Sequence, residues 1–283
     1  MTSERWTSAP QFTRALPPAQ IAAREGHAAL RGGNIYYWDT GGDGTPIVLM
    51  HPATGSAHMW LYQQPVFAKA GFRVIGWSRR GHRGSDPVDR SNPGSASQDL
   101  IDLLDHLQIA RAHLVASAAG GAISFDAALS FPDRIASLVI SSSVGGAQDK
   151  DYLAASASIR PPGFDSWPSD FREIGPSYRA ADPDGVQRWL ALEHGAVTGE
   201  RLGQKPLMHV TFAALEKLHC PTLLMTGDAD LWMPPVFMRR YARHILKAEL
   251  LLFPECGHAL YWEAPDLFNG EVLTFLKRVS HLG

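Results

Sequence analysis

The chain contains little cysteine, little net charge and no long apolar run. Cys220 and Cys256 are the only cysteines among 283 residues, which gives no disulfide framework and makes a reducing cytoplasm the expected location. The 26 basic and 28 acidic side chains leave a formal net charge of −2, so neither nucleic acid nor a membrane surface is an expected partner. No apolar stretch approaches the roughly 20 residues that span a bilayer, and the polar stretch 1–24 lacks a signal-peptide core. We therefore expect a soluble, cytoplasmic protein.

Strand and helix patterns alternate along the chain, as a mostly parallel sheet with crossover helices requires. An antiparallel hairpin, 28–30 with 34–38, is expected near the start. The run 47–50 is short and continuously apolar, which is typical of a strand covered on both faces. The sequence therefore predicts an α/β fold, with further strands at 73–77 and 135–140, others that begin at 113, 223 and 250, and helices at 57–70, 96–107, 122–129, 185–194 and 210–217.

A tight turn of small residues joins the strand that begins at His113 to the following helix. The turn reads Ala116-Ser117-Ala118-Ala119-Gly120, a small-x-nucleophile-x-Gly pattern whose middle residue points its side chain out of the turn. That residue is Ala118, and its methyl group cannot attack a substrate. The hydroxyl of Ser117 is next to it, but adjacent residues at a strand end point to opposite sides. Position 118 is therefore the expected site.

Two further loops carry residues suited to acid–base catalysis. The apolar run from Leu223 ends in an acidic turn that contains Asp228 and Asp230, and the run from Leu250 ends in a Gly-His loop at His258. A carboxylate can hold an imidazole in one tautomer, and the imidazole can then take a proton from a nucleophile. Along the chain, the tight turn at Ala118 comes first, the acidic turn second and the histidine loop third. This order differs from the orders of the catalytic residues on chymotrypsin-like and subtilisin-like folds.

These three motifs, in this order on this strand pattern, resemble the α/β-hydrolase superfamily, in its esterase, lactonase and perhydrolase-like branch, over nearly the whole chain. The resemblance implies a mostly parallel eight-stranded sheet flanked by helices. It also implies an N-terminal extension at 1–24, a core made of 25–144 and 218–283, and a helical lid at 145–217, where Pro, Ser, Asp and aromatic residues are frequent. A lid of this kind excludes water and shapes the pocket.

The same resemblance assigns catalytic roles. Ala118 occupies the nucleophile position, and His258 is the expected base. Asp230 is the expected acid, because the family pattern places the acid three residues past a glycine, here Gly227. Asp228 lies in the same turn and is the competing candidate, with turn stabilisation as its alternative role. The expected catalytic set is therefore position 118, Asp230 and His258.

An oxyanion hole needs two backbone N–H groups aimed at the developing negative charge. The resemblance assigns one to Ala119, directly after the nucleophile position. It assigns the other to Ala53, in the loop that follows the first buried strand. Pro52 stands in that loop where the family more often has glycine, and a proline has no N–H to donate. Donation from the backbone of Ala53 is unaffected by this departure.

Large side chains cluster in sequence around these loops, and some are expected to line the substrate cleft. In that position they would select an apolar or aromatic group. The histidines show no metal-ligand spacing, and no glycine-rich phosphate loop is present. We therefore expect a small-molecule substrate and neither a metal nor a cofactor, and the sequence leaves a homodimer open. The expected substrate-binding residues are Trp60, Trp77, Trp232, Met233 and Tyr261.

Three hypotheses account for an alanine at position 118. In the first, the chain is an engineered Ser-to-Ala variant of a serine hydrolase for small carboxylic esters or lactones, and is inactive or nearly so. The intact Asp230 and His258 favour it, because drift that removed a nucleophile would also erode its partners. In the second, the chain is a natural non-hydrolytic protein that binds a small molecule. In the third, His258 deprotonates a substrate directly, as in lyases or cofactor-free enzymes on this fold.

Overall fold

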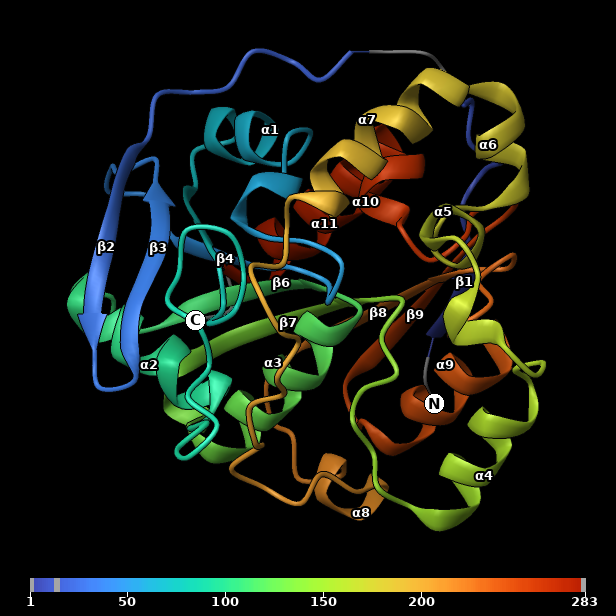
Figure 1. The fold of residues 1–283 in the computed structure, drawn as a ribbon. Coiled ribbons are helices and arrows are strands. Elements are labelled where there is room, and N and C mark those ends of the chain that lie inside the picture. Colours follow the sequence, from blue (N-terminus) through green and yellow to red (C-terminus); the bar gives the residue numbers. More distant parts are fainter. Residues whose placement is uncertain (1–2, 13–15, 281–283) are drawn as a thin grey trace.

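A nine-stranded sheet forms the centre of the computed structural model, which describes residues 3–12 and 16–280 (Figure 1). The strand order is β1-β9-β8-β7-β6-β4-β5-β3-β2, and every neighbouring pair from β1 to β5 runs parallel. The α/β fold with a mostly parallel sheet is therefore confirmed. The strands are β1 (Ser3–Trp6), β2 (Arg24–Leu30), β3 (Gly33–Asp39), β4 (Pro46–Met50), β5 (Arg73–Trp77), β6 (Ala112–Ser117), β7 (Ile135–Ser141), β8 (Thr222–Gly227) and β9 (Ala248–Phe253).

The predicted count of eight strands is wrong by one, because the stretch 1–24 contributes β1 at the edge of the sheet. β1 pairs in parallel with β9, and Arg5 and Glu4 form ion pairs with Glu271 and Arg239. All four residues of β1 are exposed, and they carry no apolar alternation. Periodicity therefore could not reveal a strand that is held by backbone pairing and surface charges.

The predicted antiparallel hairpin is present as β2 and β3. Its turn is closed by Gly33, whose φ of +130° is accessible mainly to glycine. β3 continues the sheet by pairing antiparallel with β5. The hairpin therefore extends the parallel part of the sheet beyond β5, and β1 extends it beyond β9.

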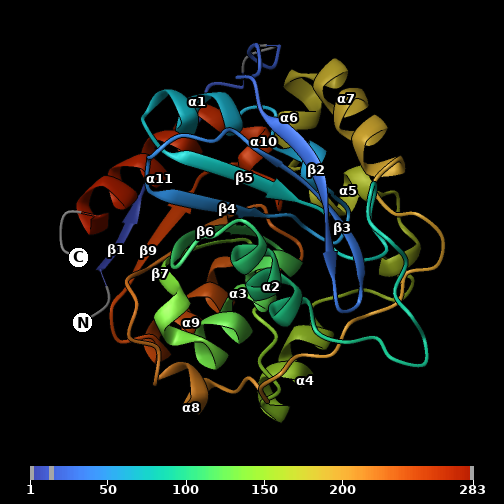
Figure 2. The same cartoon turned by 90° about the vertical axis from the view of Figure 1, so that its left-hand side faces the viewer.

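Helices cover both faces of the sheet (Figure 2). Two of them, α1 (Gln64–Lys69) and α11 (Pro265–Ser280), lie on one face. The opposite face is covered by α2 (Ala96–His106), α3 (Ala119–Ser130) and α9 (Pro235–His244). The two layers bury separate apolar clusters against the sheet, which is why strands such as β4 read as continuous apolar runs.

The predicted helix at 57–70 is two separate elements. A short 3₁₀ turn, Ala57–Met59, comes first, and Oγ of Ser56 accepts a hydrogen bond from its His58 N–H. The helix α1 starts only at Gln64, with Pro65 in its first turn. Proline lacks an N–H and fits the first turn of a helix, so it marks a new start and not a continuation.

The chain between β7 and β8 carries most of the irregular helical structure. Figure 1 shows α5, α6 and α7 grouped together on one side of the molecule. Two predicted helices in this stretch are present as α7 and α8, while three others were not predicted. The elements are α4 (Lys150–Ser158), a 3₁₀ turn (Phe164–Ser166), α5 (Ser169–Glu173), α6 (Pro176–Ala181), α7 (Pro183–His194) and α8 (Phe212–Leu215).

This insertion is fastened to the segment that follows β9. Nε1 of Trp262 donates to the carbonyl of Gly185 at 3.2 Å, and Nε1 of Trp189 donates to the hydroxyl of Tyr261 at 3.3 Å. Trp262 and Tyr261 belong to α10 (Leu260–Glu263). The insertion therefore packs next to His258, two residues before α10. Within residues 3–12 and 16–280, no helix is long and apolar enough to cross a membrane.

Candidate active site

The turn between β6 and α3 holds Ala118 in a strained backbone conformation. Ala118 has φ 48° and ψ −116°, and such a conformation costs a non-glycine residue about 1–3 kcal/mol. A Cβ on Gly120 would lie 2.1 Å from the carbonyl oxygen of Met50, and one on Gly121 would lie 2.5 Å from Oγ of Ser143. Both glycines are therefore needed for α3 to pack this closely against the sheet. Residue 118 then lies directly after the end of β6.

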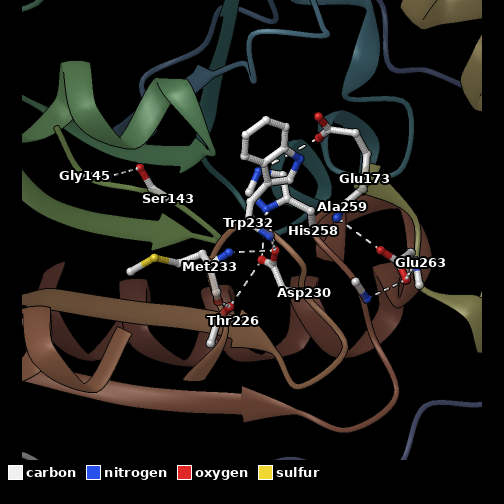
Figure 3. A network of polar contacts seen from close by, with 12 residues as sticks. Ser143, Gly145, Glu173, Thr226, Asp230, Trp232, Met233, His258, Ala259 and Glu263 are labelled. Atoms are coloured by element: carbon white, nitrogen blue, oxygen red, sulfur yellow. Dashed lines mark hydrogen bonds and ion pairs between the residues drawn. The ribbon is translucent and has the colours of Figure 1, made fainter. Parts of the chain in front are cut away.

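His258 and Asp230 form a directly bonded pair. Nδ1 of His258 lies 2.9 Å from each carboxylate oxygen of Asp230. Because an ionised carboxylate only accepts hydrogen bonds, Nδ1 carries a hydrogen, and in the neutral ring it is the nitrogen that keeps it. Asp230 is in turn held by the backbone N–H groups of Trp232 and Met233, which donate to Oδ1 at 2.8 and 2.9 Å. This network fixes the imidazole with Nε2 turned away from Asp230 (Figure 3).

A second carboxylate lies on the other side of this imidazole. Oε2 of Glu173, the last residue of α5, is 3.9 Å from Nε2 of His258 (Figure 3). Burial alone would lower the pKa of His258, but Asp230 and Glu173 outweigh it and raise that pKa to about 9. Burial raises the pKa of Glu173, and the charge of His258 opposes this shift without cancelling it.

Glu263 fixes the loop that carries His258. One of its carboxylate oxygens accepts the backbone N–H groups of Gly175 and Gly257 at 2.9 and 2.8 Å, and the other accepts that of Ala259 at 3.1 Å. Burial raises the pKa of Glu263 to about 7, and these three hydrogen bonds oppose that shift. Gly175 belongs to the insertion, so Glu263 joins the insertion and the histidine loop in one network.

A cavity of about 150 Å³ opens above Ala118 and His258. Thr54, Val144 and Glu173 line it and were not among the predicted residues. The full lining is Ala53, Thr54, Ala118, Ala119, Val144, Glu173, Trp232 and His258.

The loop that carries Ala53 is held in place by a buried arginine. Arg79 donates from Nη1 to the carbonyl of His51 at 2.8 Å and from Nη2 to that of Pro52 at 3.2 Å. The backbone N–H of Arg79 also donates to Nε2 of His51 at 3.1 Å. Pro52 therefore does not loosen this loop, because Arg79, just after β5, holds the Pro52 carbonyl by a hydrogen bond. Ala53 and Ala119 both reach the cavity.

The structure brings only one of the five predicted substrate-binding side chains to this cavity. Trp232 lines it, whereas Trp60, Trp77, Met233 and Tyr261 are buried elsewhere. Nε1 of Trp77 contacts Sδ of Met50, and the Trp60 ring packs on the Tyr261 ring at 5.0 Å between centroids. The correction has a simple cause: closeness in sequence to a catalytic loop does not decide which way a side chain faces.

The two competing candidates lie outside this site. Asp228 is exposed, and its carboxylate accepts the backbone N–H of Glu255 at 2.6 Å, which is the turn-stabilising role considered for it. Ser117 is buried in β6 and does not line the cavity. Its Oγ has no hydrogen-bond partner among the residues that the structure describes.

Comparison with known proteins identifies the family. Residues 47–271 match the family model described as the alpha/beta hydrolase family. The chain belongs to this family. It is 32% identical over 265 residues to the dihydrolipoyllysine-residue acetyltransferase component of an acetoin cleaving system from Pseudomonas putida, covering 87% of this chain and 68% of that protein.

Two further proteins are similar over most of their length. A 2-hydroxy-6-oxononadienedioate/2-hydroxy-6-oxononatrienedioate hydrolase from a Pseudomonas species is 27% identical over 276 residues, covering 87% of this chain and 93% of that protein. Among solved structures, an N-acyl homoserine lactone degrading enzyme is 25% identical with a TM-score of 0.71, covering 88% of this chain and all of that one.

Proposed function

We propose that the cavity binds a carboxylic ester or lactone of a small, apolar or aromatic compound, and that serine at position 118 gives the catalytically competent hydrolase. One observation carries this proposal: the Asp230–His258 pair opens onto the same cavity as the strained turn at Ala118. The fold alone would not support it, because this fold hosts many reactions. One similar protein is named a hydrolase and another a lactone degrading enzyme, which agrees with the proposed reaction class.

In the proposed mechanism, serine Oγ at position 118 attacks the substrate carbonyl while Nε2 of His258 takes the hydroxyl proton. Asp230 keeps the imidazole in the tautomer with hydrogen on Nδ1 and stabilises its cation. The backbone N–H groups of Ala53 and Ala119 hold the oxyanion. His258 then returns the proton to the leaving alcohol, and water hydrolyses the acyl enzyme with the same base.

The segment 145–217 acts as a lid in this proposal. Glu173 of this segment reaches the cavity, as does Val144 directly before it, and the backbone of Glu173 is bonded to the loop of His258 and Ala259. Trp232 offers an aromatic wall to the acyl or alcohol group in this cavity. Water exclusion by such a cover strengthens the electrostatic interactions within.

The substitution Ala118→Ser tests the proposal. Loss of the serine from a complete triad costs about 10⁶-fold in kcat, so the serine chain should exceed the alanine chain by several orders of magnitude on p-nitrophenyl acetate or γ-butyrolactone. The double variant Ala118→Ser/His258→Ala should lose this gain, and Ala118→Ser/Ser117→Ala should keep it. Absence of any gain in Ala118→Ser would reject the serine-hydrolase proposal.

The alternative functions give different results in the same experiment. A small-molecule binder would show a ligand-raised melting temperature, with no turnover by either chain. A base-dependent lyase or cofactor-free enzyme would show turnover by the alanine chain on a substrate with an acidic C–H, lost in His258→Ala.

A further inference from the structure

Two buried glutamates lie near His258, and their carboxylates differ in environment. The carboxylate of Glu263 accepts three backbone N–H groups. The carboxylate of Glu173 accepts no hydrogen bond from the residues that the structure describes, and its ion-pair partner is Nε2 of His258 at 3.9 Å. Burying a carboxylate without hydrogen bonds is costly, so such a group is a candidate for function and not for structural support.

The backbone of Glu173 fixes this carboxylate relative to the imidazole. Its carbonyl oxygen accepts the N–H groups of His258 and Ala259 at 2.9 and 3.0 Å. Glu173 also ends α5, which is fastened through Gly175 to Glu263. The two side chains lie next to each other (Figure 3), and both residues line the cavity. Their distance does not depend on a mobile surface contact.

We propose that Glu173 is a catalytic base, and that with His258 as acid it hydrolyses a small ester or lactone by direct attack of water in the alanine chain. The proposal rests on the proposed function for the electrophile, a carbonyl bound next to Ala53 and Ala119. Ala118 lacks the hydroxyl group of a serine, so solvent or substrate can occupy that position in the cavity. Water there can approach both the carbonyl and the Glu173 carboxylate.

The proposed steps balance in protons and bonds. Glu173 takes one proton from water as the water oxygen forms a bond to the carbonyl carbon, and the carbonyl electron pair becomes an oxyanion. Collapse of this intermediate breaks the bond to the leaving oxygen, which receives the Nε2 proton of His258. Glu173 then returns its proton to Nε2, directly across the gap between them or through one water. The products are a carboxylic acid and an alcohol, or a hydroxy acid from a lactone.

Two further residues of the cavity lining carry polar side-chain atoms that are buried and unpaired. Oγ1 of Thr54 and Nε1 of Trp232 are buried, and neither has a hydrogen-bond partner among the described residues. Both residues line the cavity together with Glu173. Buried polar atoms are almost always paired in folded proteins, so these two are expected to bond a ligand or an ordered water when the site is filled.

The pH profile separates this route from the serine route. The direct route needs protonated His258 and ionised Glu173, whereas the serine route needs neutral His258. The groups that act on this pair are Asp230, Glu263, Arg172 and Glu193. Because His258 titrates at about pH 9, the rate of the alanine chain should fall above that pH. The rate of Ala118→Ser should rise towards the same pH.

Initial rates on p-nitrophenyl acetate test the role of Glu173. We expect the alanine chain to exceed the buffer rate, and Glu173→Gln to lower this excess by about 100-fold, within the range of general acid–base catalysis. Asp170→Asn removes a carboxylate from the same helix, outside the cavity lining, and should leave the rate unchanged. The pKa of His258, followed by NMR of its ring, should fall in Glu173→Gln, which shows that the variant is folded and that the pair is coupled.

The outcomes distinguish this inference from the proposed function. If Ala118→Ser is active but the alanine chain is no faster than buffer, or Glu173→Gln is as fast as its parent, the role of Glu173 is rejected while the serine mechanism stands. If the alanine chain is active through Glu173 and Ala118→Ser adds nothing, the serine mechanism is rejected and the role of Glu173 stands. If both chains fail on esters and lactones, both proposals are rejected.

Discussion

Both carboxylate oxygens of Asp230 lie 2.9 Å from Nδ1 of His258. The same carboxylate is held by two backbone N–H groups of the following turn, so it cannot rotate away from the ring. An aspartate fixed in this way selects one imidazole tautomer, which determines the atom that faces the cavity. The site is therefore organised before any substrate binds.

Asparagine in place of Asp230 should reveal this control of the tautomer. In the Ala118→Ser chain, Asp230→Asn should lower kcat by about 10⁴-fold, because an amide can donate to Nδ1 and favour the wrong tautomer. Asp228→Asn changes an exposed carboxylate that accepts the backbone N–H of Glu255, and should keep near-parental activity. Ester hydrolysis by the two variants checks the prediction, and equal rates would contradict it.

Alanine in place of Gly120 should damage the turn at Ala118. The added Cβ would lie 2.1 Å from the carbonyl oxygen of Met50, so α3 must move away from β4. We expect a loss of about 2–4 kcal/mol in the free energy of unfolding, as for other overpacked or strained sites.

Gly270 provides the matched control for this change. It lies on α11, and an added Cβ meets no atom within 4 Å. Gly270→Ala should stabilise the protein by up to about 1 kcal/mol, because alanine favours the helix more than glycine does. Urea unfolding of the two variants measures both effects, and a harmless Gly120→Ala would contradict the tight approach of α3 to the sheet.

Removal of one partner from the buried ion pair between Arg80 and Asp99 should be strongly destabilising. Both side chains are at most 5% exposed, and Nε and Nη2 of Arg80 donate to the carboxylate at 2.8 and 2.9 Å. Arg80→Met leaves the Asp99 charge buried without its partner, at an expected cost of about 3–5 kcal/mol. Arg90 forms a pair with Glu200 that is more than half exposed, and Arg90→Met should cost at most about 1 kcal/mol. Denaturant midpoints of the two variants compare them, and similar losses would oppose the prediction.

Stability should depend on the protonation of His258. The pKa of this residue is raised to about 9 in the folded protein, above its ordinary value of 6.5. Its favourable contribution is therefore complete below about pH 6.5 and is lost as the pH rises through 9. The urea midpoint should fall over this interval, and it should fall less in His258→Gln. An equal fall in both proteins would show that other groups cause it.

Much of the site could be predicted because its residues follow strands. Ala118, Asp230 and His258 each come after an apolar run, and parallel strands end at one edge of a sheet. The chain order and spacing were therefore enough to place these three together. The role expected for Ala53 came instead from the resemblance to the α/β-hydrolase superfamily. None of this depended on knowing how the insertion folds.

Glu173 could not be predicted in this way. It lies in a stretch of short helices whose positions depend on tertiary contacts, such as its backbone bonds to His258 and Ala259. No local pattern marks such a residue, and one glutamate among many gives no signal. The break before α1 was missed for a related reason: apolar side chains continue through it at helical spacing, while Pro65 sets the actual start.

The short strand β1 also determines how far the chain can be shortened. It covers one side of β9 from Glu249 to Leu252, and the Thr7 N–H adds a further bond to the carbonyl of Leu252. A chain that begins after Thr7 would present β9 as an open edge, with unpaired backbone groups along a strand whose side chains are mostly apolar. Strand addition by a second copy would follow from that exposure. Removing the first seven residues would thus turn a stable sheet edge into a starting point for aggregation.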